Sequence, residues 1–591
     1  MNEKHTPQRH LPIRFLSAIL AIVIVLSGLL AIDLANRGMF WRFAWSVTGE
    51  EDPIGQIRGV AQWVSGLRRP QPDTARMTPI QHTNVNPFGV NTFFQLEPDP
   101  DKIDAGMQMI SDAGFGWIRQ QFEWAEIEVD GRGQFTDSRN DINGDGQADT
   151  INAWDKYDRI VELADTYGLD IQVRLDNPPA WARNPQLGDF APPEDTQDFV
   201  NYAVAVAERY RGRVQYYQIW NEPNLTFEWG GLPVNPEGYT ELLCRTYDAL
   251  KAVDPNIVVI TGALAPTIDL SGANLMDFIY LQRMYDAGAG DCFDILSVQG
   301  YGLFSGPTDR RMRPTTVNID LNIYIRDLMV ANGDAHKPIW MSEAAWNFVP
   351  SEDEHPEEII QRYNYGQVTP EQAGEYIVGL YERTQQEWSW VGVINYWFFT
   401  RPNDTESNQA FYYFRMVEPD YDPNADPPFP PLPVYTALSE YINTLTPTLY
   451  TGVHQVENNW AIKAGENVEI VETDDAQFSE AMQTTSLNFV ADGTHIFLRW
   501  RGDSLTVAVD DENETVIMSH SDEWQTTRID SSLLPQSSQI SISADTPFVV
   551  DSVTVSNRLT QNLFGVVLVA VIGIGGLILS VIAGLMGRFG R

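Results

Sequence analysis

Two glutamates in this chain each end an apolar, aromatic run. Glu222 follows the run YYQIWN (216–221), and Glu343 stands in the run WMSEA (340–344). An ionised carboxylate beside apolar walls is costly unless it is paired, so each glutamate is either a structural hydrogen-bonding partner or a working acid. Two carboxyl groups that face each other across a cleft are the apparatus of glycosidic-bond cleavage. The spacing therefore raises the question of whether the fold brings them together.

Eight strand-like runs alternate with helix-length segments between about residue 88 and residue 442, for example at 102–113, 196–210, 236–253 and 371–388. This alternation predicts an α/β fold, a (β/α)8 TIM barrel with long insertions. The alternative is an open doubly wound sheet, but no glycine-rich phosphate loop follows the first strand. The predicted strands are FGVNTFF (88–94), GWIRQQ (116–121), DIQVRL (170–175), VQYYQI (214–219), IVVITG (257–262), DILSV (294–298), PIWMS (338–342) and VGVINYW (391–397).

In such a barrel the active site forms at the carboxyl ends of the strands. Glu222 ends the fourth predicted strand, Glu343 ends the seventh, and Arg119 ends the second. Strands four and seven lie across the barrel mouth from each other. We therefore expect the two carboxyl groups to face one another.

These segments resemble a large clan of retaining glycoside hydrolases with a (β/α)8 barrel, clan A, and most of all its xylosidase and iduronidase family (family 39-like). The resemblance covers the barrel and is carried by WNEP (220–223), WMSE (340–343), Arg119 with FEW (122–124), RLDNPPAW (174–181), Tyr301 and Trp397. It implies that Glu222 is the general acid/base and Glu343 the nucleophile. Retention requires carboxyl groups about 5 to 5.5 Å apart, against about 6.5 to 9.5 Å for inversion.

The resemblance also implies roles around the two glutamates. Asn221 would hydrogen-bond a sugar hydroxyl, while Arg119 and Tyr301 would hold Glu343 ionised and oriented. Flat faces for sugar rings are expected from Trp397, Trp181 and Trp346, with core packing as the alternative. The family often has a histidine where this chain has Gln299, which cannot titrate, so subsite specificity is the property most affected.

A second constellation has the oxygen ligands of a Ca²⁺ loop. In DINGDGQAD (141–149) oxygen-bearing side chains alternate and the sixth position is glycine. The position for the bidentate acid is Asn152, so the pattern is incomplete. The segment is either a structural Ca²⁺ site or a polar turn that caps its own backbone, and no cofactor is required for the chemistry. The candidate ligands are Asp141, Asn143, Asp145, Gln147 and Asp149.

Apolar runs lie near both ends of the chain, at 15–32 and 563–586, and each has basic residues on its outer side. Their length and flanks predict two transmembrane helices, with 1–14 and 587–591 in the cytoplasm and the middle of the chain outside. The first run could instead be a signal peptide, but it lacks a clear small-x-small cleavage site, so we expect an uncleaved anchor. Residues 33–83 are predicted to be a juxtamembrane linker.

The predicted barrel covers 84–446, and short alternating segments over 447–557 predict a small β-sandwich. Packing and spacing are the expected roles of this second domain, although sandwich modules beside barrels often bind sugars. The segments are VEIVET (468–473), THIFLRW (494–500), LTVAVD (505–510), ETVIMS (514–519), QISISA (539–544) and DSVTVS (551–556).

Charge and cysteine content limit the remaining classes. Thirty-nine Lys and Arg residues against 80 Asp and Glu give a formal net charge of −41, which excludes nucleic acid as a partner. Cys244 and Cys292 fit neither a disulfide framework nor a metal site, so two buried thiols are expected, with one disulfide as the alternative if the region is exported.

The sequence thus predicts a membrane-anchored retaining glycosidase that acts on an oligo- or polysaccharide on the extracytoplasmic side of the cell membrane. One alternative is a non-catalytic carbohydrate-binding barrel, although binding alone needs no pair of glutamates. Another is a transglycosylase, which would use the same covalent intermediate with a different acceptor.

Overall fold

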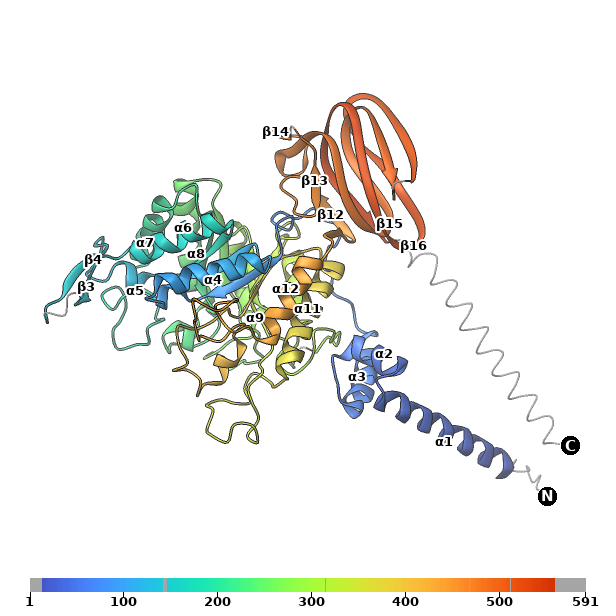
Figure 1. Ribbon diagram of the computed structural model, residues 1–591, viewed down its shortest axis with the longest axis horizontal. Coiled ribbons are helices and arrows are strands. Elements are labelled where there is room, and N and C mark those ends of the chain that lie inside the picture. Colours follow the sequence, from blue (N-terminus) through green and yellow to red (C-terminus); the bar gives the residue numbers. More distant parts are fainter. Residues whose placement is uncertain (1–12, 142–145, 314, 467, 511, 558–591) are drawn as a thin grey trace, which may run out of the picture.

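A parallel barrel of eight strands forms the larger domain of the molecule, on the left in Figure 1. The computed structural model describes residues 13–141, 146–313, 315–466, 468–510 and 512–557. All eight predicted strands are present in it. They are β1 (Phe88–Thr92), β2 (Trp117–Glu123), β5 (Asp170–Asp176), β6 (Tyr216–Asn221), β7 (Val258–Ala263), β8 (Leu296–Gln299), β9 (Ile339–Ala344) and β10 (Val391–Tyr396).

The strand order shows that the sheet closes on itself. Hydrogen-bonded neighbours run β7-β6-β5-β2-β1-β10-β9-β8, and every pair along this path is parallel. The two ends of the path meet through parallel bridges between Ile260 and Ile295 and between Leu264 and Val298. The barrel prediction is confirmed, and an open doubly wound sheet is excluded.

Helices cover the outside of the barrel (Figure 1). Side chains of Asp99, Asp195, Asn235 and Thr369 cap the first turns of four of them. The four helical segments named from the sequence are confirmed within two residues at each end. The barrel helices are α4 (Pro100–Asp112), α5 (Trp124–Ile127), α6 (Asp155–Tyr167), α7 (Thr196–Arg209), α8 (Pro236–Val253), α9 (Asp277–Asp286), α10 (Leu321–Ala331), α11 (Pro370–Glu387) and α12 (Pro433–Thr444).

Short elements fill the connections between the barrel strands and helices. They include the antiparallel hairpin of β3 (Thr136–Asn140) and β4 (Asp149–Asn152) between β2 and α6. The 3-10 helices are η1 (Phe94–Leu96), η2 (Phe227–Trp229), η3 (Ala289–Asp291), η4 (Ala410–Phe414) and, in the second domain, η5 (Gln477–Ser479).

The barrel interior changes from apolar to polar along the strands. At the amino ends the strands bury an apolar cluster that includes Trp117, Tyr216, Val258, Ile295, Trp340 and Val393. Two residues further along each strand, the buried side chains are Arg119, Gln218, Ile260, Ser297, Ser342 and Asn395. Most are polar and hydrogen-bonded to one another, for example Gln218 Nε2 to Ser342 Oγ at 3.0 Å. A polar layer of this kind supports charged groups above it.

Residues after the barrel form a separate, mostly antiparallel sheet domain with its own hydrophobic core (Figure 1). Its strands are β11 (Thr448–Leu449), β12 (Gly452–Gln455), β13 (Ile462–Ala464), β14 (Glu469–Glu472), β15 (Glu480–Val509) and β16 (Glu512–Ser556). The last two are long and pair with each other in several registers. The prediction of a second β domain is confirmed, and its packing as a sandwich stays a prediction.

Trp460 joins the two domains. Its backbone N–H donates to the carbonyl of Asn84 at 2.9 Å, and its ring lies edge-on to Phe88 with centroids 6.0 Å apart. The same ring packs against the cores of both domains. The second domain is therefore seated on the barrel rather than tethered to it by a loose linker.

The chain before the barrel contains three helices, α1 (Ile13–Ala35), α2 (Met39–Thr48) and α3 (Pro53–Gly66). Among the residues described, no single helix is long and apolar enough to span a membrane. Two helical segments joined by a bend of 67°, Ile24–Ala35 and Met39–Thr48, are together long and apolar enough to do so. The predicted spans therefore stay predictions, and the one at 563–586 lies outside the described residues, as do 1–12 and 587–591.

Where the sequence predicts a linker, α2 and α3 instead pack on the barrel at the loop that follows β8. Gly306 N–H donates to the carbonyl of Gly49 at 2.9 Å, and Arg310 N–H donates to that of Val47 at 3.1 Å. Arg311 pairs with both Glu50 and Asp309 at 2.7 Å. Because so many polar groups are satisfied across this contact, residues 39–66 form part of the folded barrel unit.

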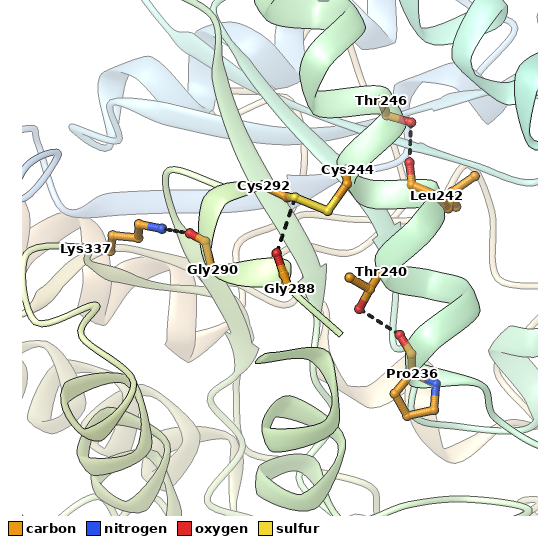
Figure 2. The surroundings of a disulfide bond; sticks show 9 residues. All are labelled: Pro236, Thr240, Leu242, Cys244, Thr246, Gly288, Gly290, Cys292 and Lys337. Atoms are coloured by element: carbon orange, nitrogen blue, oxygen red, sulfur yellow. Dashed lines mark hydrogen bonds between the residues drawn. A yellow bond between two sulfur atoms is a disulfide. The ribbon is translucent and has the colours of Figure 1, made fainter. Parts of the chain in front are cut away.

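The two cysteines form a disulfide, so the expectation of two buried thiols is wrong (Figure 2). Cys244 lies on α8 and Cys292 directly follows η3, and both side chains are half-buried. The helix brings Cys244 beside a loop 48 residues further along the chain, a proximity that residue spacing alone does not disclose. The bond ties α8 to the segment that leads into β8.

We expect removal of this disulfide to destabilise the barrel. Closing a loop with a sequence separation of 48 lowers the entropy of the unfolded chain by an amount worth roughly 2–4 kcal/mol. The double variant Cys244→Ala/Cys292→Ala should unfold at a lower denaturant concentration than the oxidised protein and should not respond to a reductant. If the oxidised and reduced proteins unfolded at the same denaturant concentration, the expectation would be wrong.

Candidate active site

A β-bulge turns Glu343 toward the inside of the barrel. Trp340 and Ser342 point inward, so strict alternation along β9 would direct Glu343 outward with Met341. The pairing with β8 shifts at this point, because Val298 pairs with Met341 whereas Gln299 pairs with Glu343. The extra residue on β9 re-aims the side chain, and Glu343 is only 5% exposed.

Arg119 is the charged partner of Glu343. Its Nη1 donates to Glu343 Oε1 at 3.0 Å, and both side chains are buried. The residue lies third in β2, which continues to Glu123, so the expectation that it ends the strand is wrong. Its position one layer below the strand ends still lets the long side chain reach the carboxylate.

Three further acceptors fix the Arg119 guanidinium in place. Nε donates to Gln218 Oε1 at 2.7 Å, Nη1 to Asn91 Oδ1 at 2.7 Å and Nη2 to Asn221 Oδ1 at 2.8 Å. Burial lowers the pKa of Arg119 from its ordinary value, and Glu343 opposes that effect. Sequence reasoning missed Asn91 and Gln218. Each is a polar residue within an otherwise apolar run, and that pattern could have indicated a buried polar group with a specific partner.

Tyr301 completes the surroundings of Glu343. It lies two residues past β8, and its hydroxyl donates to Glu343 Oε2 at 2.8 Å. Burial, and then the charge of Glu343, raise the pKa of Tyr301 well above its usual range, so the phenol keeps its proton. Each oxygen of Glu343 therefore accepts a hydrogen bond, one from a cation and one from a neutral hydroxyl.

Loss of the Tyr301 hydroxyl should weaken turnover without unfolding the protein. A hydrogen bond to a charged group contributes about 1.5–3 kcal/mol, so Tyr301→Phe is expected to lower kcat/KM about 10- to 100-fold on a glycoside substrate. Tyr435→Phe is the matched control, because that hydroxyl bonds the carbonyl of Met109 outside the barrel. Equal rates for the wild type and Tyr301→Phe would contradict the role assigned to the bond.

The end of β6 departs from regular strand geometry around Asn221. Trp220 and Glu222 have positive φ angles of 77° and 36°, a left-handed conformation that costs a non-glycine residue about 1–3 kcal/mol. Gln218 and Asn221 both reach Arg119 although they are three residues apart, which alternation does not allow. The turn at Trp220 makes this possible, and it sends the indole outward, where Nε1 donates to the carbonyl of Glu228.

Glu222 has surroundings that favour its protonated form. Burial, followed by the charges of Glu343 and Glu228, raises the pKa of Glu222 well above its usual range. Gln299 Nε2 donates to Glu222 Oε1 at 3.2 Å, and the backbone of Gln299 pairs with Glu343. Gln299 thus lies between the two glutamates. The surroundings of Glu222 favour its neutral form and those of Glu343 include a cation, as an acid and a nucleophile need.

The predicted aromatic faces differ in their surroundings. Trp397 directly follows β10, is partly exposed and lies edge-on to Phe93. Trp181 contacts Trp124, and its Nε1 donates to the carbonyl of Glu128 at 2.8 Å; no contact found among the described residues links it to either glutamate. Trp346 is 1% exposed and packs in the core, so its prediction as a sugar-binding face is wrong.

The candidate Ca²⁺ loop joins β3 to β4, on the hairpin beyond β2. Of its predicted ligands, Asn143 and Asp145 lie outside the described residues. Asp141 Oδ2 accepts a hydrogen bond from the backbone N–H of Gly146 at 2.9 Å, which a polar turn also provides. In the part of the chain that is described, no three acidic, His or Cys side chains cluster to hold a metal ion. The Ca²⁺ site stays a prediction.

No protein-family model and no curated protein matches the chain. Among solved structures, a family 39 glycoside hydrolase from the gut symbiont Bacteroides cellulosilyticus WH2 has a TM-score of 0.44 and 15% identity, covering 79% of this chain and 83% of its own. A monomeric β-xylosidase from Caulobacter crescentus CB15 has a TM-score of 0.42 and 14% identity, covering 80% and 99%.

An exo-β-1,4-mannosidase from Opitutaceae bacterium strain TAV5 has a TM-score of 0.41 and 14% identity, covering 63% of this chain and 62% of its own. Family 39 among these structures is the family that the two glutamate segments resemble. Because all three TM-scores lie below 0.5, the function is inferred from the geometry of the site.

Proposed function

We propose that this chain is a retaining glycoside hydrolase in which Glu222 is the general acid/base and Glu343 the nucleophile. The observation that carries the proposal is that two carboxyl groups at one end of the barrel have different hydrogen-bond partners and different electrostatic surroundings. Glu222 has a raised pKa because it is buried and close to Glu343, whereas Glu343 accepts hydrogen bonds from Arg119 and Tyr301. A non-catalytic sugar-binding barrel has no need of this division.

In the first step Glu343 attacks the anomeric carbon while Glu222 gives its proton to the leaving oxygen. The glycosidic bond breaks and a covalent glycosyl ester forms on Glu343. In the second step Glu222, now ionised, takes a proton from water, which attacks the same carbon and releases Glu343. Two inversions give net retention. Arg119 and Tyr301 orient the carboxylate in both steps, and a sugar acceptor in place of water would make the enzyme a transglycosylase.

The test is a panel of aryl glycosides incubated with the full chain, with the product anomer followed by NMR. Hydrolysis of at least one sugar with retention at the anomeric carbon is the expected result. Release of the opposite anomer would exclude the double displacement. A panel without any turnover would favour the non-catalytic binding barrel, and transfer to added sugar acceptors in preference to water would favour the transglycosylase.

We also propose that the enzyme is held at the cell membrane with its barrel on the extracytoplasmic side, acting on an oligo- or polysaccharide there. Support comes from the apolar runs at 15–32 and 563–586 and from the basic residues on their outer sides. Cell fractionation tests this: the protein should remain in the membrane fraction and be cleaved by protease added to intact cells. Recovery of a free soluble protein would contradict the anchor.

A further inference from the structure

A third carboxyl group, that of Glu228, belongs to the same site. It lies on η2, the short helix that follows β6. Trp220 Nε1 donates to its backbone carbonyl at 2.9 Å, and Trp229 packs against the Trp220 ring with centroids 5.5 Å apart. These contacts fix η2 to the strand end that carries Asn221 and Glu222, and the Asn221 side chain hydrogen-bonds the Glu228 carboxyl.

The Glu228 carboxyl has an unsatisfied acceptor. Among the described residues, its buried Oε2 accepts no hydrogen bond. Burial raises the pKa of Glu228 to about 8, with the Arg174 charge and hydrogen bonding by the Asn221 side chain acting in the opposite direction. A buried polar atom without a hydrogen-bond partner is uncommon and lowers the stability of the protein. We therefore expect a group of the bound substrate to donate a hydrogen bond to Glu228 Oε2.

Arg174 is the cation whose charge acts most strongly on Glu228. It lies on β5, and its Nε is 2.7 Å from Asp176 Oδ2, with both side chains buried. Its charge acts on Glu228 and on Glu343. Arg174 pairs with Gln218 of β6, so it lies on the strand beside the one that leads to Glu222 and η2, within electrostatic range of the Glu228 carboxyl.

A sugar hydroxyl both donates and accepts hydrogen bonds, so a carboxyl oxygen and a guanidinium N–H together satisfy it. We propose that Glu228 and Arg174 bind one hydroxyl of the sugar ring held between Glu222 and Glu343, which makes Glu228 a specificity-determining residue. This inference rests on the proposed glycosidase function.

A substrate series tests the inference on the full chain. It uses the best aryl glycoside from the panel and its analogues that each lack one ring hydroxyl. Glu228→Gln should lower kcat/KM on the parent glycoside about 10- to 100-fold. On one particular deoxy analogue the variant and the wild type should be equal, because the hydroxyl that Glu228 binds is already missing. Glu440→Gln, which removes an exposed carboxylate on α12, should leave all rates unchanged.

Arg174→Lys provides a second variant should Glu228→Gln fold poorly, and its loss should vanish on the same deoxy analogue. Equal losses on every analogue would show a purely structural role and overturn the inference, as would unchanged kcat/KM in both variants. In either case an active wild type would leave the glycosidase function intact. A wild type that hydrolyses no glycoside would overturn both proposals.

Discussion

Replacing Glu343 by alanine should lower turnover of an aryl glycoside roughly 10⁴-fold or more, the scale of loss when a residue that forms a covalent intermediate is removed. The reason is specific to the site. Glu343 accepts hydrogen bonds from both a guanidinium and a phenol. Without it, Arg119 and Tyr301 have no nucleophile to orient, and Glu222 can only protonate a leaving group that nothing displaces.

The loss must be separated from unfolding, because removing one partner of a buried ion pair also destabilises a protein, by about 3–5 kcal/mol in unfavourable cases. Glu343→Gln keeps the shape of the side chain and should be equally inactive while melting closer to the wild type. Azide added to Glu343→Ala should restore activity and yield a glycosyl azide of inverted configuration, since a single displacement replaces two. Wild-type turnover by either variant would eliminate Glu343 as the nucleophile.

The barrel could be predicted from the sequence because its strands are short, apolar and separated by helix-length segments. What alternation could not predict is which way the key side chains point. Glu343 faces inward only because β9 contains a bulge after Met341, and Asn221 does so only because Trp220 adopts a positive φ. Both departures lie at the site itself, where regular geometry is commonly given up.

Other features depended on contacts between distant segments. Cys244 and Cys292 pair because α8 packs beside the segment before β8, and α2 docks on a loop more than 250 residues away, as the bond from Gly306 to Gly49 shows. Nothing in the sequence indicated that Glu228 belongs to the site, since a glutamate in a loop is ordinarily exposed. Asn91 and Gln218 could have been identified as polar residues within buried strands, and both accept hydrogen bonds from Arg119.

Replacing Glu222 by glutamine should remove the alkaline limb of the pH profile of kcat/KM. The pKa of Glu222 is raised, so its carboxyl holds a proton below that pKa and loses it as the pH rises through it. Activity that depends on the acid is therefore present on the low-pH side and lost on the high-pH side. For a substrate with a poor leaving group, the variant should be slower by about 10² to 10⁴-fold at the optimum.

The leaving group provides the control. An activated nitrophenyl glycoside needs little protonation, so its first step should be nearly as fast in Glu222→Gln as in the wild type. Azide should then accelerate breakdown of the glycosyl ester and give a product of retained configuration, opposite to that from Glu343→Ala. Two variants with opposite azide products would assign the two carboxyl groups independently of the pH profile.

Gln299 gives an independent check on the same titration. Its amide donates to Glu222 Oε1, which favours the ionised carboxylate and so lowers the pKa of Glu222. In Gln299→Ala that stabilisation is gone, the pKa of Glu222 should rise further, and the alkaline limb should move to higher pH while its shape is kept. A limb that persists in Glu222→Gln, or one that moves to lower pH in Gln299→Ala, would show that another group is the acid.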